Sequence, residues 1–329
     1  MNIYLSGFGR IGRQWIELLD QKRELLNVHY GLRVKIVGLI GRNGALVCEE
    51  GFDMRTVLRY ETLEQLAKGE NLEWTKEWHV HGDVLVDSTP TYESHGEPGY
   101  TYIKKALQMG MHVVSISKGA LLHHYDELMG SAAEKGLKIK YSGATAAALP
   151  ALDIGEHSIV GAELLGFEGV LNGTSNYVLT EMQERGISYE QAIAAAKEQG
   201  VAEPDPTLDV SGADSAAKVV LLSNALLGTK ARKQDVDLEG IEQFPGSSDK
   251  DRVVRLVASA YKREDNTVQL AVKPKALSPD HPLAAIRGTN KAITFHTVEM
   301  GVITVSGGAS SPLGAASAAL KDLINLNRC

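Results

Sequence analysis

Cysteine is the rarest residue of this sequence: only Cys48 and Cys329 occur among 329 residues. Two cysteines exclude a disulfide framework and a cluster of thiolate metal ligands. The same scarcity fits a reducing cytosol, so we expect a cytoplasmic protein without a metal site.

Long apolar runs and blocks of basic residues are also missing. Without an apolar run of about eighteen residues, no membrane span is expected. A net charge of −7 without a basic block argues against non-specific nucleic-acid binding. The N-terminus enters a strand pattern directly, with no basic segment and cleavage site of a secretion signal. We therefore expect a small-molecule partner and, from the length, two domains of ordinary size.

What the sequence does contain is a glycine-rich turn at its beginning. A short apolar strand at residues 2–5 runs into Gly7-Phe8-Gly9-Arg10-Ile11-Gly12 and then into an amphipathic helix. This order is typical of a dinucleotide-binding turn, in which the glycines allow a tight turn, close approach of a pyrophosphate and packing of helix on strand. A glycine-rich turn without ligand is the alternative. The residues predicted to contact the cofactor here are Gly7, Gly9, Arg10, Ile11 and Gly12.

Further apolar strands follow, each ending in polar residues. They are expected at 34–40, 84–87, 113–116 and 137–141. Such a series, with helical segments between strands, predicts a doubly wound parallel sheet of the Rossmann type. Because ligands bind at the carboxyl ends of the strands in such sheets, Thr89 and Lys118 are predicted to lie near the cofactor. Lys118 could instead be a surface loop lysine.

The second strand bears on the choice between NAD and NADP. In NAD sites an acidic residue commonly ends this strand and binds the ribose hydroxyls. Here the strand ends in Gly41-Arg42-Asn43, where Arg42 could meet a 2′-phosphate. The cofactor is therefore NADP or NAD, and the pattern favours NADP. Arg42 could alternatively be a solvated loop residue or stack on adenine.

The remaining chain predicts a second, α+β domain. We place the domains at 1–141 and 142–306, with 307–329 returning to the first domain through the glycine-rich turn that contains Gly308. Second-domain strands are expected at 163–171, 268–272, 292–297 and 303–305, and helices at 177–185, 188–199 and 253–261. A last helix is expected at 315–326.

The stretch from Gly200 to Lys218 carries the most chemistry. Two prolines in Glu203-Pro204-Asp205-Pro206 predict an extended loop. A helix should start near Ser211, with Asp214 in its first turn. Asp214 and Lys218 then share one helix face. Because apolar residues flank Lys218 on both sides, we expect it to be at least half buried and a candidate acid/base group. An ordinary ion pair that supports a helix is the alternative.

Cysteine placement restricts the class of dehydrogenase. The run GFGRIGR looks like the start of glyceraldehyde-3-phosphate dehydrogenases, which need a cysteine nucleophile. Neither Cys48 nor Cys329 lies at the start of a second-domain helix. Hydride transfer between an alcohol and a carbonyl, with one acid/base group and no covalent intermediate, is the expected reaction.

Two segments together resemble homoserine dehydrogenases. They are Asn172-Gly173-Thr174-Ser175-Asn176-Tyr177 and the Gly200–Lys218 stretch, whose acidic residues and lysine have the family's spacing. The resemblance covers nearly the whole chain. It implies interconversion of L-homoserine and L-aspartate 4-semialdehyde with NAD(P), a step in threonine, methionine and isoleucine biosynthesis, and it implies a homodimer.

The resemblance also implies roles for single residues. Lys218 would donate the proton to the aldehyde oxygen, and Lys118 would lie between nicotinamide and substrate. Gly200 and Gly308 would approach the cofactor. The residues expected to contact the substrate are Thr174, Glu203, Asp209 and Asp214. For Asp209, a role in orienting Lys218 is equally open, and Asp205 is expected to be structural.

The sequence departs from the family's pattern in two places. Ser142 replaces a glutamate that many members use in a monovalent-cation site, and the turn at 310–313 is less glycine-rich. With the chain ending at residue 329, we expect no C-terminal regulatory domain. Two other functions stay open: a dehydrogenase of another small amino or hydroxy acid, and a non-catalytic NAD(P)-binding sensor.

Overall fold

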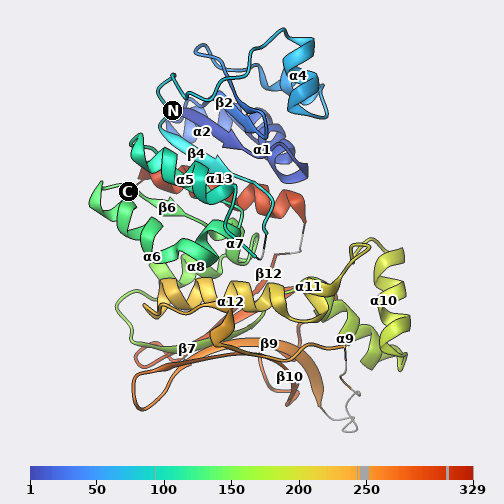
Figure 1. The fold of residues 1–329 in the computed structure, drawn as a ribbon. Coiled ribbons are helices and arrows are strands. Elements are labelled where there is room, and N and C mark those ends of the chain that lie inside the picture. The colour runs from blue at the N-terminus through green and yellow to red at the C-terminus, as the bar shows by residue number, and fades with distance from the viewer. Residues whose placement is uncertain (93, 243, 245–251, 309–310, 329) are drawn as a thin grey trace. The chain divides into compact units, whose positions relative to one another are not determined.

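The computed structural model describes residues 1–92, 94–242, 244, 252–308 and 311–328. Cys329 and the turn residues 309 and 310 lie outside the described part. The chain divides into two compact units, residues 1–147 with 311–329 and residues 148–310 (Figure 1). These divisions fall a few residues after the boundaries expected at 141 and 306. Among the described residues, no helix has the length and apolar character needed to cross a membrane.

The first unit is built on a six-stranded sheet with strand order β3-β2-β1-β4-β5-β6. All neighbouring strands run parallel except β3, which pairs antiparallel with β2. This is the predicted Rossmann-type sheet with an added edge strand. Its strands are β1 Asn2–Ser6, β2 Lys35–Gly41, β3 Gly44–Val47, β4 Val84–Asp87, β5 His112–Ser115 and β6 Ile139–Lys140. Its helices are α1 Arg10–Gln21, α2 Arg23–Tyr30, α3 Met54–Leu58, α4 Leu63–Gly69, α5 Gly99–Gln108, α6 Gly119–Glu134, α7 Ser142–Thr145 and α13 Pro312–Arg328.

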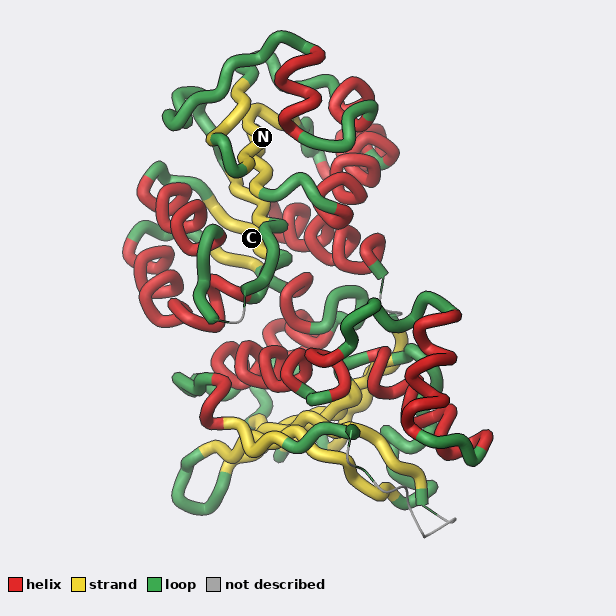
Figure 2. Tube along the Cα trace, turned by 45° about the vertical axis from the view of Figure 1, so that its right-hand side comes forward, coloured by secondary structure: helices red, strands yellow, loops and turns green. Residues whose placement is uncertain are grey.

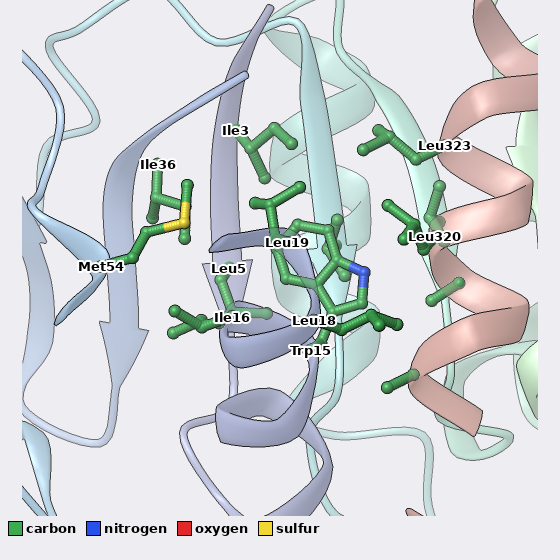
Figure 3. Packing of buried hydrophobic residues seen from close by; sticks show 14 of the residues in the cluster. Ile3, Leu5, Trp15, Ile16, Leu18, Leu19, Ile36, Met54, Leu320 and Leu323 are labelled. Atoms are coloured by element: carbon green, nitrogen blue, oxygen red, sulfur yellow. The ribbon is translucent and has the colours of Figure 1, made fainter. Parts of the chain in front are cut away.

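The last helix, α13, packs against this sheet and against α1. Figure 3 shows Leu320 and Leu323 of α13 directed toward Trp15 and Leu18 of α1, beside the strand residue Ile3. All five belong to one buried apolar cluster. Trp15 is fully buried, and burial of an aromatic side chain of this size contributes on the order of 2–3 kcal/mol. The chain's last helix is therefore part of the first unit.

Residues 142–147 also belong to the first unit. The second domain was expected to begin at residue 142, but Ser142 begins α7, which is in the first unit, and is buried. Its backbone N–H and its hydroxyl both donate to the Asp322 carboxylate of α13, at 2.9 and 2.8 Å. Lys321 donates to the Ser142 hydroxyl at 2.8 Å. The position at which many family members carry a cation-site glutamate is thus held by hydrogen bonds to α13.

The second unit contains a six-stranded sheet of order β12-β11-β7-β9-β10-β8. Neighbouring strands are antiparallel except β10 and β8. Its strands are β7 Leu164–Val170, β8 Val236–Leu238, β9 Val253–Lys262, β10 Val268–Leu277, β11 Lys291–Thr297 and β12 Val302–Gly307. Its helical segments are α8 Ala151–Asp153, a π-helical turn Ile154–Ser158, α9 Gly173–Arg185, α10 Tyr189–Glu198, α11 Thr207–Val210, α12 Ala213–Leu226 and a 3₁₀ turn Lys233–Asp235. Figure 2 shows helices gathered on one face of this sheet.

Two predictions about the second unit were wrong. The expected helix 253–261 is the strand β9, a central strand between β7 and β10 whose side chains are buried along most of its length. Its residues are mostly apolar on both faces, so their periodicity does not distinguish a helix from a strand. Helix α9 begins at Gly173, four residues earlier than expected, because the Asn172 side chain caps it by accepting from Ser175 N–H at 2.9 Å. Helix α12 begins at Ala213, near Ser211 as expected, and its N-cap is Gly212, at φ 80°.

Candidate functional site

The glycine turn between β1 and α1 is shaped by close backbone contacts. Gly7 has φ +86°, and a Cβ placed there would lie 2.5 Å from the Ser88 carbonyl oxygen, which follows β4. Gly7 N–H donates to Ile40 O of β2 at 3.1 Å. The turn therefore lies where β1 meets both β2 and β4, the point at which the strand order reverses and nucleotides bind in such sheets.

The start of α1 is open to an anion. Gly9 is the N-cap residue, and a Cβ built on it meets nothing within 4 Å. Residues 9–13 are all described, and no side chain caps the helix there and no acidic residue occupies its first turn. Unpaired N–H groups and the helix dipole at such an end favour a phosphate. Gly12 is buried, and a Cβ there would clash with Gly7 O, so the close packing of α1 on the turn requires glycine at this position.

Two hollows open on the surface of the first unit. The smaller one, of about 340 Å³, lies beside the glycine turn and is lined by Phe8, Gly9, Arg10, Arg13, Gln14, Glu17, Leu58 and Glu61. The larger one, of about 750 Å³, includes Lys35, the first residue of β2, and so lies at the opposite end of that strand from the turn. The larger hollow also contains a helix start, that of α3, but the Asp53 side chain caps it, whereas the start of α1 beside the smaller hollow has no side-chain cap.

The other predicted cofactor residues of this unit follow strand ends. Arg42 is exposed directly after β2. Thr89, two residues after β4, is buried, and its N–H and hydroxyl donate to Asp87 at 3.2 and 2.8 Å. Burial raises the pKa of Asp87 above its ordinary value. Lys118 is half-buried at the N-cap of α6, with its N–H donating to Thr91 Oγ1 at 3.2 Å. Each therefore stands at the carboxyl edge of the sheet.

In the second unit, the predicted Asp214–Lys218 pair is formed. The two residues lie one turn apart on α12, and Lys218 Nζ is 2.5 Å from Asp214 Oδ2. Lys218 Nζ also donates to Leu171 O, just after β7, at 2.8 Å. The side chains are only 13% and 16% exposed. The ammonium is held between a carboxylate and a carbonyl, so its direction is restricted.

Asn172 joins this pair to Asp209. Its amide nitrogen donates to Asp209 Oδ1 at 2.6 Å and to Asp214 Oδ2 at 2.9 Å. Burial raises the pKa of Asp209, and the negative charge of Asp214 raises it further, whereas the Asn172 hydrogen bond opposes the rise. The end of β7, α11 and the start of α12 thus bring two carboxylates, an amide and an ammonium together.

The remaining predicted residues of this unit lie on loops or at the edge of the cluster. Thr174 is buried in the first turn of α9 and donates to Val201 O at 3.3 Å. Glu203 is exposed in the loop before α11. Gly200 has φ +67° and open space at its Cβ position. Gly308, at φ +69°, approaches the backbone so closely that a Cβ would lie 2.6 Å from Leu149 N.

Asp205 has a local role in the same loop. Its Oδ1 accepts from Thr207 N–H and hydroxyl at 3.1 and 2.6 Å. These hydrogen bonds lower the pKa of Asp205. They shape the turn into α11, as expected for a structural residue.

Sequence reasoning missed Lys291, the first residue of β11. It is 1% exposed, which is exceptional for lysine. Burial lowers the pKa of Lys291 to about 8, the positive charge of Lys218 lowers it further, and Asp214 opposes the change. The signal was present, because Lys291 is in phase with the buried Ile293 and Phe295 on a period of two. A lysine on a buried strand face indicates an unusual electrostatic environment for its ammonium group.

Among the described residues, no group of three or more His, Cys, Asp or Glu side chains could hold a metal ion. The structure therefore offers two regions for function. One is the glycine turn of the first unit, which can accept a dinucleotide. The other is the Asn172–Asp209–Asp214–Lys218 cluster of the second unit, which can exchange a proton with a bound polar substrate.

Comparison with known proteins adds independent evidence. The family model described as homoserine dehydrogenase matches residues 150–324, and the model of the homoserine dehydrogenase NAD binding domain matches residues 7–142. The chain is 32% identical to a homoserine dehydrogenase of Methanocaldococcus jannaschii, covering 99% of this chain and 98% of the relative. It is 32% identical to an NAD(+)-dependent homoserine dehydrogenase of Pseudomonas canavaninivorans, covering 98% and 95%.

A solved structure extends the similarity to three dimensions. A hyperthermophilic archaeal homoserine dehydrogenase in complex with NADPH matches with a TM-score of 0.83 at 25% identity, over 98% of this chain and 96% of that one. Both halves of the chain are therefore similar, in sequence and in fold, to one kind of protein.

Proposed function

The chain belongs to the homoserine dehydrogenase family, an NAD(P)-dependent oxidoreductase family that acts on a CH–OH group. We propose a separate role in this reaction for each of its two units. The reaction interconverts L-homoserine and L-aspartate 4-semialdehyde. The first unit binds the cofactor, and the second unit binds the amino acid and moves the proton. The buried pair of Lys218 with Asp214 is the observation that carries this proposal.

The glycine turn fits the diphosphate of a dinucleotide. No atom lies within 4 Å of the position that a Cβ of Gly9 would occupy, and the α1 N-terminus favours negative charge. NAD(P) bound there supplies or accepts the hydride. Gly7, Arg10, Ile11 and Gly12 form the cradle of this site together with Gly9. Thr89 and Lys118 line the carboxyl edge of the same sheet, and Gly200 and Gly308 are the proposed cofactor contacts from the second unit.

Lys218 is the proposed general acid in the direction of aldehyde reduction. Its ammonium gives a proton to the oxygen that becomes the hydroxyl, and it takes the proton back in the oxidation of homoserine. Asp214 and Leu171 O hold Nζ at 2.5 and 2.8 Å, so the proton is presented in a defined direction. A positioned acid contributes on the order of 10²–10⁴-fold to the rate.

The substrate carries an ammonium and a carboxylate, so its site needs both signs of charge. Glu203, exposed in its loop, and Asp214 are the proposed acceptors for the substrate ammonium, with Thr174 as a hydroxyl partner. Asp209 shares the Asn172 amide with Asp214, which supports a role in orienting the cluster more than a direct substrate contact. Lys118 is the proposed cation between nicotinamide and substrate.

We propose that NADP is preferred over NAD. The support is Arg42, exposed where β2 ends in Gly41 with no carboxylate at its end. One relative is described as NAD(+)-dependent and one solved relative binds NADPH, so the family accommodates both cofactors. Values of kcat/KM for each cofactor decide the question, and a higher value for NAD+ would reject the preference.

We further propose that the enzyme is a homodimer that works in the cytoplasm, in the synthesis of amino acids derived from homoserine. Exposed Val298, Met300 and Val302, at 55%, 48% and 59%, form an apolar edge beside β12 that suits a subunit contact. The scarcity of cysteine supports a reducing compartment. Light scattering of the purified chain tests the dimer, and a monomer mass at micromolar concentration would contradict it.

The decisive assay follows NAD(P)H absorbance with L-homoserine in one direction and aspartate 4-semialdehyde in the other. Turnover with either cofactor supports the proposal, and absence of turnover with both rejects it. In Lys218→Met, kcat should fall on the order of 10²-fold or more while cofactor binding is retained. An unchanged kcat would remove Lys218 from the chemistry. A panel of other amino and hydroxy alcohols shows whether homoserine is the best substrate.

A further inference from the structure

The end of β2 is a two-residue turn. Strands β2 and β3 pair antiparallel with Gly41 opposite Gly44, so Arg42 and Asn43 form the turn between them. Both of these side chains are exposed. In a sheet of this type the second strand ends beside the ribose of the adenosine, and the charge found there bears on the choice between NAD and NADP. The groups around this turn are therefore candidates for cofactor selection.

A carboxylate reaches this turn from a later part of the chain. Asn43 Nδ2 donates to Glu64 Oε1 at 3.3 Å, and the two residues are 21 positions apart. Glu64 lies in the first turn of α4 and is exposed. An acidic group is thus bound to the residue that follows Arg42, although β2 itself ends in Gly41 without a carboxylate.

The start of α4 is held against the end of β2. A Cβ built on Gly41 would lie 3.0 Å from Leu63 Cδ1. Leu63, the residue before Glu64, is buried. Thr62 caps the helix, because its hydroxyl accepts from Gln65 N–H at 3.2 Å. Packing and a helix cap therefore set the position of Glu64 at the turn.

The chain before α4 also borders the glycine turn. Leu58, the last residue of α3, and Glu61 line the hollow beside that turn. Arg13 of α1 donates to Leu58 O at 3.0 Å. Residues 58–64 therefore extend from the proposed diphosphate site to the end of β2, where the ribose of a dinucleotide follows.

A carboxylate at the end of β2 acts differently on the two cofactors. It accepts hydrogen bonds from the ribose hydroxyls of NAD, whereas it repels the 2′-phosphate of NADP. Arg42 has the opposite effect, because a guanidinium attracts a phosphate. The two charges of this turn therefore oppose each other in the selection of the cofactor.

We infer that Glu64 is a specificity-determining residue for the cofactor: its carboxylate favours NAD over NADP and limits the preference for NADP that Arg42 confers. This inference rests on the proposed cofactor site at the glycine turn. It predicts a site that binds both cofactors, with Glu64 and Arg42 setting the ratio of the two affinities.

The test compares Glu64→Gln, Glu64→Lys and Glu70→Gln with the full-length wild type. Glutamine keeps the shape of the side chain and removes its charge, whereas lysine reverses the charge. Glu70 is the C-cap residue of the same helix, accepts from Tyr60 OH at 2.7 Å, and serves as the matched control. Binding of NADPH and of NADH is measured by fluorescence titration without substrate, at low salt and in about 0.5 M NaCl.

In Glu64→Gln, the Kd for NADH divided by the Kd for NADPH should rise about fivefold, because the charge that repels the 2′-phosphate is removed. In Glu64→Lys this ratio should rise further. The rise should shrink in about 0.5 M NaCl, since salt screens exposed charges. Glu70→Gln should keep the wild-type ratio.

Three results would overturn the inference. They are an unchanged ratio in Glu64→Gln, an equal rise in Glu70→Gln, and a rise that does not depend on salt, which would indicate a change of shape and not of charge. If the wild type binds neither NADPH nor NADH, the proposed cofactor site and the role of Glu64 are both rejected. If the ratio changes as expected in a protein that does not oxidise homoserine, the role of Glu64 stands and the proposed reaction is rejected.

Discussion

The buried charge of Lys291 should make the fold less stable at neutral pH than a neutral side chain would. Its pKa is lowered from 10.5 to about 8, chiefly by burial. The unfolded chain keeps the ordinary value, so between about pH 8 and about pH 10.5 the unfolded state binds more protons than the folded state. The free energy of unfolding therefore rises with pH across this window, and the cost is present in full below it.

The size of the effect follows from the two pKa values. A fall from 10.5 to about 8, at 1.36 kcal/mol per pH unit, corresponds to about 3 kcal/mol. Lys291→Met removes the charge and fills similar space, so we expect its free energy of unfolding to exceed that of wild type by up to about 3 kcal/mol at pH 7. This gain in the free energy of unfolding should decline from about pH 8 and disappear at about pH 10.5.

Chemical denaturation followed by far-ultraviolet circular dichroism measures this difference. Tryptophan fluorescence is unsuitable, because Trp15, Trp74 and Trp78 all belong to the first unit while Lys291 belongs to the second. Lys273→Met is the control: its side chain is 36% exposed, so loss of its ion pair should change stability by less than about 1 kcal/mol.

Two results would refute this reasoning. One is a Lys291→Met variant that is less stable than wild type at pH 7, which would mean that the ammonium makes net favourable contacts. The other is a difference in stability that stays constant from about pH 7 to about pH 10.5. Such a constant difference would reflect packing and not the titration of Lys291.

Three further predictions concern the other parts of the site. Gly7→Ala should destabilise the protein by about 1–3 kcal/mol and weaken NADPH binding about tenfold or more. The reason is that φ of Gly7 is +86° and the added Cβ would lie 2.5 Å from Ser88 O. Chemical denaturation measures the first effect and NADPH fluorescence titration the second. Arg42→Glu should lower the ratio of kcat/KM for NADP+ over NAD+ by about tenfold or more, and an unchanged ratio would place Arg42 outside the 2′-phosphate site. Asn172→Ala should cost about 2 kcal/mol or more and raise KM for homoserine, since both a helix cap and a bridge between two carboxylates are lost. Ser188→Ala, which removes only the cap of α10, should cost about 1 kcal/mol and leave KM unchanged.

Local sequence patterns were sufficient to predict several elements of this protein. The glycine turn was predicted together with its strand and helix, because tight turns and helix starts depend on residues within a few positions of each other. The Asp214–Lys218 pair followed from helical spacing alone. The helix expected from residue 188 is α10, and Ser188 is its N-cap.

Patterns of the same length were insufficient where burial decides the structure. Strand β9 was predicted as a helix because its apolar run fits both periods, and only its place between β7 and β10 makes it a strand. Helix α9 was predicted to begin four residues too late, because Asn172 was not recognised as its N-cap.

The sequence by itself determined the strand, glycine turn and helix at the start of the chain, and the helical spacing that pairs Asp214 with Lys218. Only the tertiary structure decided that Asn172 and Asp209 join that lysine, and that Lys291 is buried beside them. Asn172 lies 46 positions before Lys218 and Lys291 lies 73 positions after it, so no local spacing relates these three residues. Strand register and helix packing bring them together, and their electrostatic effect exists only at the distances that folding creates.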